Sequence, residues 1–215
     1  MRLLVIDTSG PECAAGIYDA SSSEMLALRS ETIGKGHAEI LPGMIEAATK
    51  EADVPLKALD RVAVTIGPGS FTGIRVGVAM ARGLALSLGI PAVGVTTLQV
   101  VVEGSLQQAK PVLGLIDARR EELYAQLFAA EGSPLGGPSA LHYHDARSLG
   151  EQHDALLVGS GARILAGAVS PQIDSMPLQV IGKIGARLPK DTKASPLYIR
   201  GADAKPQTGF AVQHA

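Results

Sequence analysis

Apolar runs of two lengths alternate along the first half of the chain, separated by polar or glycine-rich breaks. Short runs bounded by turn residues predict strands, and longer runs with apolar positions three and four apart predict helices. The close spacing of the first three short runs predicts an antiparallel meander. The expected order is β-β-β-α-β-α-β, with strands at residues 2–8, 13–18, 25–32, 62–66 and 92–95 and helices at residues 38–52 and 72–88.

The stretch from the strand at 62–66 into the helix at 72–88 carries the most information. Gly67-Pro68-Gly69 ends the strand, and Ser70 or Thr72 can cap the helix by accepting a hydrogen bond from a free N–H group of its first turn. Small residues then recur at every fourth position and form one ridge, which lets another backbone approach closely. That backbone belongs either to the chain's own sheet or to a second chain, and the ridge consists of Gly73, Gly77, Ala81 and Ala85.

The glycine-rich turn has two interpretations. Glycines and a helix N-terminus favour a phosphate, but no Lys-Ser or Lys-Thr pair follows, so the turn is not a P-loop. The alternative is a tight strand-to-helix turn that lets the helix lie flat on a sheet.

A weak internal repeat indicates two related lobes. The segment ending in Asp7 resembles the segment ending in Asp117, and each is followed by a polar turn and another strand. The fold class predicted from this plan is α/β, an actin-like ATPase (ribonuclease H-like) fold with two lobes of β-β-β-α-β-α topology, the second shortened. The expected lobes are residues 1–104 and 105–215, and the second should contain strands at 122–128, 141–144 and 155–158 and a helix at 146–153.

Composition narrows the function classes. Hydrophobic residues make up 46% of the chain but aromatic residues only 3%, so the core should consist of aliphatic side chains. The net charge of −2, with both signs interspersed, argues against tight binding of a nucleic acid by this chain alone. Cys13 is the single cysteine, the N-terminal apolar run is too short for a signal peptide, and glycine and proline break the apolar stretch at 84–102. We therefore expect a cytoplasmic protein with no membrane span.

Six motifs in order resemble the TsaB (YeaZ) family. They are Ile6-Asp7-Thr8-Ser9, Gly36-His37-Ala38-Glu39-x-Leu41-Pro42, the run from Gly67 to Arg75, Gly94-Val95-x-Thr97-Leu98, Asp117-Ala118-Arg119-Arg120 and Pro196-Leu197-Tyr198-x-Arg200. The resemblance implies a non-catalytic dimerisation subunit of the machinery that forms threonylcarbamoyladenosine in tRNA. It also implies a heterodimer with the paralogue TsaD, which holds the metal and modifies the adenosine beside the anticodon. The third subunit is the small ATPase TsaE, a homodimer is expected when the chain is alone, and tRNA is met only through the complex.

The metal of the paralogue has no counterpart in this sequence. TsaD carries two histidines four apart on its first helix, whereas here His37 is followed by Leu41 at the second position. We expect no metal site, and we expect His37 to be a helix-start residue that is hydrogen-bonded nearby. The other histidines form no helical pair, although two of them would share a strand face: His142, His144, His153 and His214.

The end of the first strand is the candidate nucleotide site. In actin-like ATPases the aspartate that ends this strand positions a magnesium-bound water near the terminal phosphate. Asp7, Thr8 and Ser9 have the carboxylate and hydroxyl groups for such a site. The alternative is a carboxylate that accepts hydrogen bonds from the N–H groups of its own turn. The second-half loop, from Asp117 to Arg120, lacks a small, hydroxyl-rich cradle. We expect a vestigial phosphate loop and no cofactor, with at most weak binding of ATP or ADP.

No catalytic residues are assigned. The surroundings of Ser70 do not match the Gly-x-Ser-x-Gly elbow of hydrolases, and Cys13 has no visible activator. The rival interpretation is an active ATP-dependent kinase or hydrolase of the actin-like class. The predicted partner interface combines the two first-half helices and consists of His37, Leu41, Met44, Ile45, Gly73, Val76, Gly77, Met80, Ala81 and Leu84.

Overall fold

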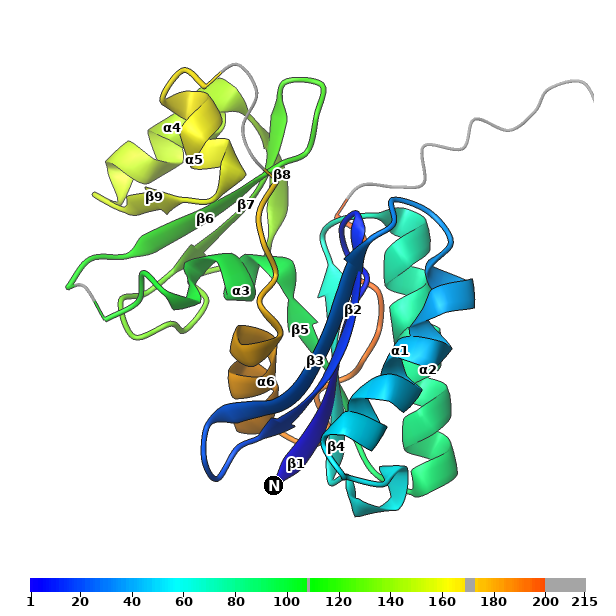
Figure 1. The fold of residues 1–215 in the computed structure, drawn as a ribbon. Coiled ribbons are helices and arrows are strands. Elements are labelled where there is room, and N and C mark those ends of the chain that lie inside the picture. The colour runs from blue at the N-terminus through cyan, green and yellow to red at the C-terminus, as the bar shows by residue number, and fades with distance from the viewer. Residues whose placement is uncertain (108, 169–172, 200–215) are drawn as a thin grey trace, which may run out of the picture.

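The computed structural model describes residues 1–107, 109–168 and 173–199 and contains two mixed sheets with helices on both faces (Figure 1). The first half contains β1 (Arg2–Asp7), β2 (Glu12–Asp19), β3 (Glu24–Thr32), α1 (His37–Glu51), the 3-10 turn η1 (Leu56–Ala58), β4 (Arg61–Gly67), α2 (Phe71–Leu88), β5 (Ala92–Thr96) and α3 (Thr97–Glu103). The second half contains β6 (Val112–Asp117), β7 (Glu122–Phe128), β8 (Ser139–His142), α4 (Tyr143–Gln152), β9 (Leu156–Val158), α5 (Ser160–Leu165) and α6 (Leu178–Arg187).

The first sheet has the strand order β3-β2-β1-β4-β5. Its first three strands form the antiparallel meander that the sequence predicts, and β4 and β5 add to β1 in parallel. The register places Leu3 opposite Arg61 and Ile6 opposite Val64, so the carboxyl ends of β1 and β4 lie side by side. This edge is where Asp7 and the glycine-rich turn meet.

The second sheet repeats this plan with the order β8-β7-β6-β9. The strand β6 takes the place of β1, pairing antiparallel with β7 and parallel with β9. A counterpart of β5 is absent from this four-stranded sheet as described. The prediction of two related lobes, the second shortened, is confirmed.

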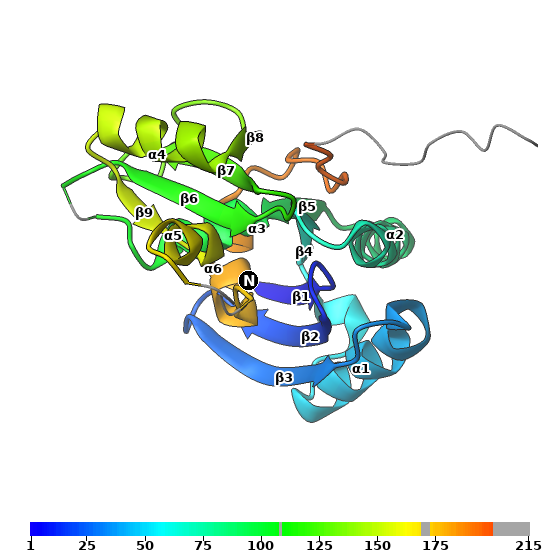
Figure 2. The ribbon, with the colours of Figure 1, turned by 90° about the horizontal axis from the view of Figure 1, so that it is seen from above.

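Each sheet is covered on both faces, as Figures 1 and 2 show from two sides. On the first sheet, α1 and α2 bury one aliphatic cluster, and α6 buries a second cluster on the opposite face together with Leu3 and Val5. On the second sheet, α4 and α5 cover one face and α3 covers the other. The helix α6 therefore crosses the lobe boundary expected at 104/105, because it follows the second sheet in sequence but packs on the first.

A buried arginine holds α6 in place. Arg61 begins β4, and its Nη1 donates to the carbonyl oxygens of Gly185 at 2.6 Å and Leu188 at 2.7 Å. Gly185 lies in the last turn of α6 and Leu188 is its C-cap, so the cation also meets the negative end of the helix dipole. The chain then runs back along the first lobe, and Leu197 N–H donates to the Ile66 carbonyl at the end of β4.

One second-half prediction is partly wrong. The strand expected at 141–144 ends at His142, and α4 begins at Tyr143 rather than near residue 146. Tyr143, Ala146 and Leu149 recur at helical spacing and pack together against the second sheet, which makes the helical conformation the better one for this segment. Within the described residues, α2 alone is long and apolar enough to cross a membrane, a property that core helices share.

Candidate functional site

The end of β1 is closed by its own side chains. Asp7 Oδ1 accepts hydrogen bonds from the Ser9 N–H at 3.0 Å, the Ser9 hydroxyl at 2.6 Å and the Thr65 hydroxyl at 2.5 Å. The Thr8 hydroxyl donates to the Gly73 carbonyl at 2.7 Å. All four side chains are buried, because β4 lies beside β1 and the turn into α2 packs closely on Thr8 and Ser9.

Burial raises the pKa of the Asp7 carboxyl group above its ordinary value of 3.8. The hydrogen bonds from Ser9 and Thr65 act in the opposite direction because they favour the carboxylate, and the nearby charge of Glu12 adds to the increase. Asp7 therefore lies in a buried turn, where neighbouring groups of the chain supply its hydrogen bonds, and not at a solvent-exposed edge of the sheet.

The glycine-rich turn is filled by the same segment. A Cβ atom added to Gly69 would collide with the Ser9 carbonyl, and one added to Gly73 would collide with the Thr8 carbonyl. Ser70 N–H also donates to the Ser9 carbonyl at 2.7 Å. The Thr8 and Ser9 carbonyls thus lie directly against the glycines, which is the packing expected of a tight strand-to-helix turn.

The same contacts explain how α2 starts. Ser70 is its N-cap, and the Ser70 hydroxyl accepts a hydrogen bond from Gly73 N–H at 3.2 Å. Of the two caps that the sequence allowed, Ser70 and Thr72, the structure therefore uses Ser70. A Cβ at Gly77 would meet the Thr8 hydroxyl, and Ala81 and Ala85 are buried in the core under the helix. The small-residue ridge therefore docks α2 on its own sheet.

This burial corrects part of the predicted interface. Seven of the ten residues assigned to it are buried in the chain's own core and offer little surface to a partner: His37, Leu41, Met44, Ile45, Gly73, Gly77 and Ala81. Val76, Met80 and Leu84 are half-buried between α1 and the outer side of α2. Placement of an interface on these two helices stays a prediction, but it must rest on their outer faces.

His37 takes the role expected of a helix-start residue. It is buried, and its Nε2 lies 3.2 Å from the Glu12 carbonyl oxygen at the start of β2. His142 and His144 do not share a strand face, because α4 begins between them, and both are largely exposed. The described residues contain no group of three or more side chains suited to hold a metal, and His214 lies outside them.

The second sheet repeats the turn at the end of its first strand. Asp117 Oδ1 accepts from Arg119 N–H at 2.7 Å, just as Asp7 accepts from the residue two further on. Each aspartate closes its own turn, which is the structural alternative that the sequence left open. The following residues, Arg119 to Glu121, have positive φ angles, and this sharp turn leads directly into β7.

Three functional candidates were missed by sequence reasoning. Phe71 and Arg75 from the first turns of α2 meet Tyr198, which arrives from near the C-terminal end of the described chain. The run from Gly67 to Arg75 and the motif that begins at Pro196 both carry the family resemblance, but nothing in their local patterns indicates that the two motifs are in contact. The final residue of the second motif, Arg200, lies outside the described residues.

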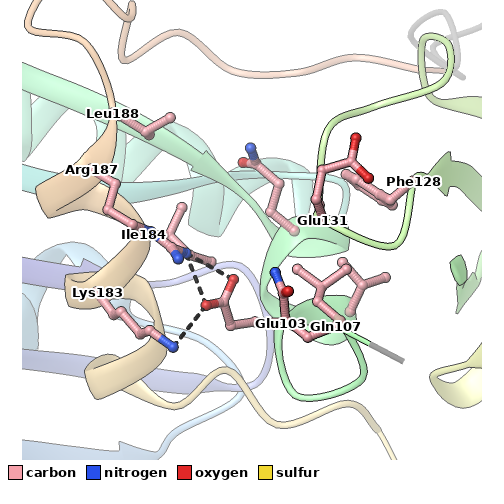
Figure 3. A pocket seen from close by; sticks show the side chains of 12 residues that line it. Glu103, Gln107, Phe128, Glu131, Lys183, Ile184, Arg187 and Leu188 are labelled. Carbon is pink, nitrogen blue, oxygen red and sulfur yellow. Dashed lines mark hydrogen bonds and ion pairs between the residues drawn. The ribbon is translucent and has the colours of Figure 1, made fainter. Parts of the chain in front are cut away.

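A cavity of about 430 Å³ lies between α3, α6 and the loop after β7 (Figure 3). Lys183 and Arg187 reach from α6 to the carboxylate of Glu103, whose side chain is 10% exposed, at 3.1 Å and 2.9 Å respectively. Phe128 and Ile184 supply apolar walls. Since the two cations already share a carboxylate, the cavity is a mixed polar and apolar hollow at the junction of the lobes rather than a free cationic site.

Comparison with known proteins adds to this geometry. A family model described as TsaD, tRNA N6-adenosine threonylcarbamoyltransferase, matches residues 30–155. An uncharacterized protein of Mycobacterium tuberculosis is 32% identical over 206 residues, covering 95% of this chain and 94% of that protein. The tRNA threonylcarbamoyladenosine biosynthesis protein TsaB of Escherichia coli is 32% identical over 126 residues, which covers 58% of this chain and 53% of TsaB.

Among solved structures, YeaZ from Pseudomonas aeruginosa superposes with a TM-score of 0.71 at 26% identity. The superposition covers 92% of this chain and 99% of YeaZ, so the likeness extends over nearly the whole of both chains.

Proposed function

The chain belongs to the TsaB (YeaZ) family, and from this premise we propose that it is the non-catalytic dimerisation subunit of a tRNA threonylcarbamoyladenosine complex. In this proposal it binds a TsaD-type paralogue, which carries the catalytic metal and transfers the threonylcarbamoyl group. The chain supports that transfer by contact and supplies no reacting group.

The observation that carries this proposal is the closed end of β1. In an actin-like ATPase this edge must present a carboxylate and hydroxyl groups to a nucleotide. Here the Asp7 carboxylate and the hydroxyls of Thr8 and Ser9 are buried and bonded to one another or to neighbouring backbone. Because these groups form hydrogen bonds within the chain, they are not presented to a nucleotide. This arrangement supports a scaffold role, with weak nucleotide binding at most.

The contact surface that we assign is the outer side of α1 and α2. Helix α2 exposes Ala79 and Leu86, the latter 86% exposed, and the half-buried Val76, Met80 and Leu84 lie beside them. Exposed apolar residues of this kind, carried on a rigid helix, are typical of a protein interface. Because paralogous chains can present equivalent surfaces, the homodimer and the heterodimer would compete for this side.

The remaining partners follow from the same proposal. A TsaE-type ATPase would bind the assembled pair, and tRNA would be held through the catalytic subunit. The exposed residues of α1 include Glu39, Glu46 and Glu51, the last paired with Arg29, but only one cation, Lys50. This acidic excess disfavours direct contact between the helix and a polyanion.

Reconstitution tests the proposal. The organism's TsaD-type paralogue, its TsaE-type ATPase and the enzyme that supplies threonylcarbamoyl-adenylate are assayed for tRNA modification with and without this chain. We expect modification to require the chain and the chain alone to hydrolyse no ATP. Modification at full rate without the chain would refute the proposal. ATP turnover by the isolated chain, abolished in Asp7→Ala, would favour the rival kinase or hydrolase interpretation.

A further inference from the structure

Two motifs that lie more than 120 residues apart in sequence build one exposed side-chain cluster. Phe71 and Arg75 come from the run that begins at Gly67, and Tyr198 comes from the segment that begins at Pro196. The Arg75 Nε donates to the Tyr198 hydroxyl at 2.8 Å. We call Phe71, Arg75 and Tyr198 the Arg75 cluster.

The rings hold the guanidinium in a fixed position. The Arg75 Cζ lies 3.6 Å from the centroid of the Phe71 ring and 5.4 Å from that of Tyr198. The two rings are 5.4 Å apart and tilted by 42°. Within the part of the chain that the structure describes, Nε is the only guanidinium nitrogen of Arg75 with a hydrogen-bond partner. The remaining donors form a planar fork on an exposed residue, and such a fork can bind a carboxylate or a phosphate in a bidentate manner.

The Arg75 cluster is ordered without being buried. Phe71 is 44% exposed and Tyr198 is 49% exposed, and Arg75 is exposed as well. Aromatic rings and an arginine that stay near half exposed contribute little to a core. The same residue types, fixed in advance, dominate the binding energy of protein interfaces because little side-chain entropy remains to be lost.

The charges around the cluster distinguish a protein partner from a nucleic acid. Helix α2 contains no acidic residue, and its exposed side carries Arg75 and Arg82. The neighbouring α1 covers the same side of the sheet (Figure 1) and exposes Glu39, Glu46 and Glu51 against one lysine, Lys50. Glu51 is paired with Arg29 of β3, so the acidic excess lies mainly at Glu39 and Glu46. A polyanion would be attracted by one helix and repelled by the other. A folded partner can match both, with carboxylates opposite α2 and basic groups opposite α1.

We propose that the Arg75 cluster is the anchor of the heterodimer interface and that it grips a carboxylate on the paralogous subunit. The inference rests on the proposed function and adds to it the residues and the chemistry of the contact. Phe71 and Tyr198 exclude water from the guanidinium, and the ion pair forms at the N-terminal end of α2. The outer side of α2 continues the contact towards Leu86.

The test compares binding of purified variants to the purified paralogue by calorimetry. Arg75→Ala should weaken the dissociation constant at least about tenfold, as expected for a central interface arginine. Tyr198→Phe keeps the ring but removes the hydrogen bond, and it should weaken binding to a smaller extent. The matched control is Arg82→Ala, which removes the same charge from the same side of α2, seven residues or about two turns further along. Arg82 lies on the same contact side, but among the described residues no aromatic ring packs on its guanidinium, so Arg82→Ala should weaken binding clearly less than Arg75→Ala.

Thermal midpoints, self-association and tRNA binding of the same variants complete the test. Unchanged midpoints with lost heterodimer binding support the anchor, whereas a lowered midpoint with retained binding would assign the cluster to folding alone. Equal losses of affinity for the paralogue in Arg75→Ala and Arg82→Ala would show that only the positive charge of α2 matters, and this result would overturn the proposal. The proposal would also be overturned if Arg75→Ala bound the paralogue normally but lost self-association or tRNA binding. Failure of the unmodified chain to bind the paralogue would refute the proposed function and the anchor with it.

Discussion

Three hydrogen bonds converge on one oxygen of Asp7, yet the carboxyl group is buried, and these two facts act on its pKa in opposite directions. Burial dominates and raises the pKa above 3.8. Asp19 forms the same turn with the residue two positions on, Ser21, but at the surface, and there the hydrogen bonds lower its pKa. The two aspartates share a local motif and differ in solvent exposure, so they form a matched pair.

The first prediction concerns the pH dependence of stability. Between 3.8 and the raised folded pKa of Asp7, the folded state binds more protons than the unfolded state, so this group's contribution to stability falls as pH rises. Asp7→Asn removes that titration. The free energy of unfolding of Asp7→Asn, minus that of the unmodified chain, should therefore increase with pH across this window and stay constant above it. Urea denaturation at a series of pH values measures the difference.

Asp19→Asn is the control and should show the opposite slope. The lowered pKa of Asp19 contributes stability that is present above 3.8 and is lost as pH falls through the folded pKa. The same subtraction should therefore decrease as pH rises through that lower window. A pH-independent difference for Asp7→Asn would contradict the account of its burial.

The second prediction contrasts two glycines of the same helix. Gly73→Ala places a methyl group against the Thr8 carbonyl, whereas Gly83 is exposed and has open space around an added Cβ. We expect Gly73→Ala to lower the free energy of unfolding by about 1–3 kcal/mol through this clash. Gly83→Ala should raise it by up to about 1 kcal/mol, because alanine favours the helix. Chemical denaturation of both variants decides, and equal effects would refute the close approach at Gly73.

At the scale of the element, α2 resolves the choice that its sequence leaves open. A ridge of small residues fits both a sheet and a second chain, and periodicity alone cannot tell them apart. The structure buries Gly77 and Ala81 against the first sheet and leaves Ala79 on the opposite, exposed side. Any docking of a partner on α2 must therefore use the face that carries Ala79 and Leu86.

The third prediction uses two alanines that are two residues apart on α2. Ala81→Arg forces a charge into a fully buried position and should cost about 3 kcal/mol or more of stability, or prevent folding. Ala79→Arg makes the same chemical change on the exposed face, so the variant should fold with an unchanged thermal midpoint. It should also lose affinity for the paralogue and for a second copy of the chain. Circular dichroism and sedimentation velocity measure the two effects, and full association by Ala79→Arg would exclude α2 from the interface.

The five strands and two long helices of the first half could be predicted because each depends on a local pattern, whereas the short elements η1 and α3 were not predicted. A strand such as β4 is a continuous apolar run that ends in glycine and proline, and α2 has its cap and its period within 18 residues. By contrast, α6 was missed although Leu178, Ile181 and Ile184 recur at helical spacing. Its packing on the first sheet could not be predicted, since its partners Leu3 and Val5 lie more than 170 residues upstream. The Arg75 cluster could not be predicted for the same reason. Both of its motifs are visible in the sequence, but only the three-dimensional fold brings Tyr198 into contact with Arg75.

At the scale of the whole molecule, the sheets follow the sequence halves but the packing does not. The helix α6 leaves the second lobe and covers the face of the first sheet that α1 and α2 do not cover. Glu103 at the end of α3 pairs with Lys183 and Arg187 of α6, so the junction between the lobes is also closed by ion pairs. The first lobe therefore depends on a helix from the far end of the described chain.

The last prediction tests this dependence with fragments. Residues 1–104 contain the complete first sheet, but without α6 they expose an aliphatic face that includes Leu3, Val5, Val93 and Val95, all fully buried in the whole chain. Arg61 would also lose both of its carbonyl acceptors. We expect this fragment to bind a hydrophobic dye and to unfold without a cooperative transition. Joining residues 176–199 to it through a flexible linker should restore cooperative unfolding, because the helix returns both the cover and the acceptors. Cooperative unfolding of 1–104 alone would show that the first lobe is an autonomous domain.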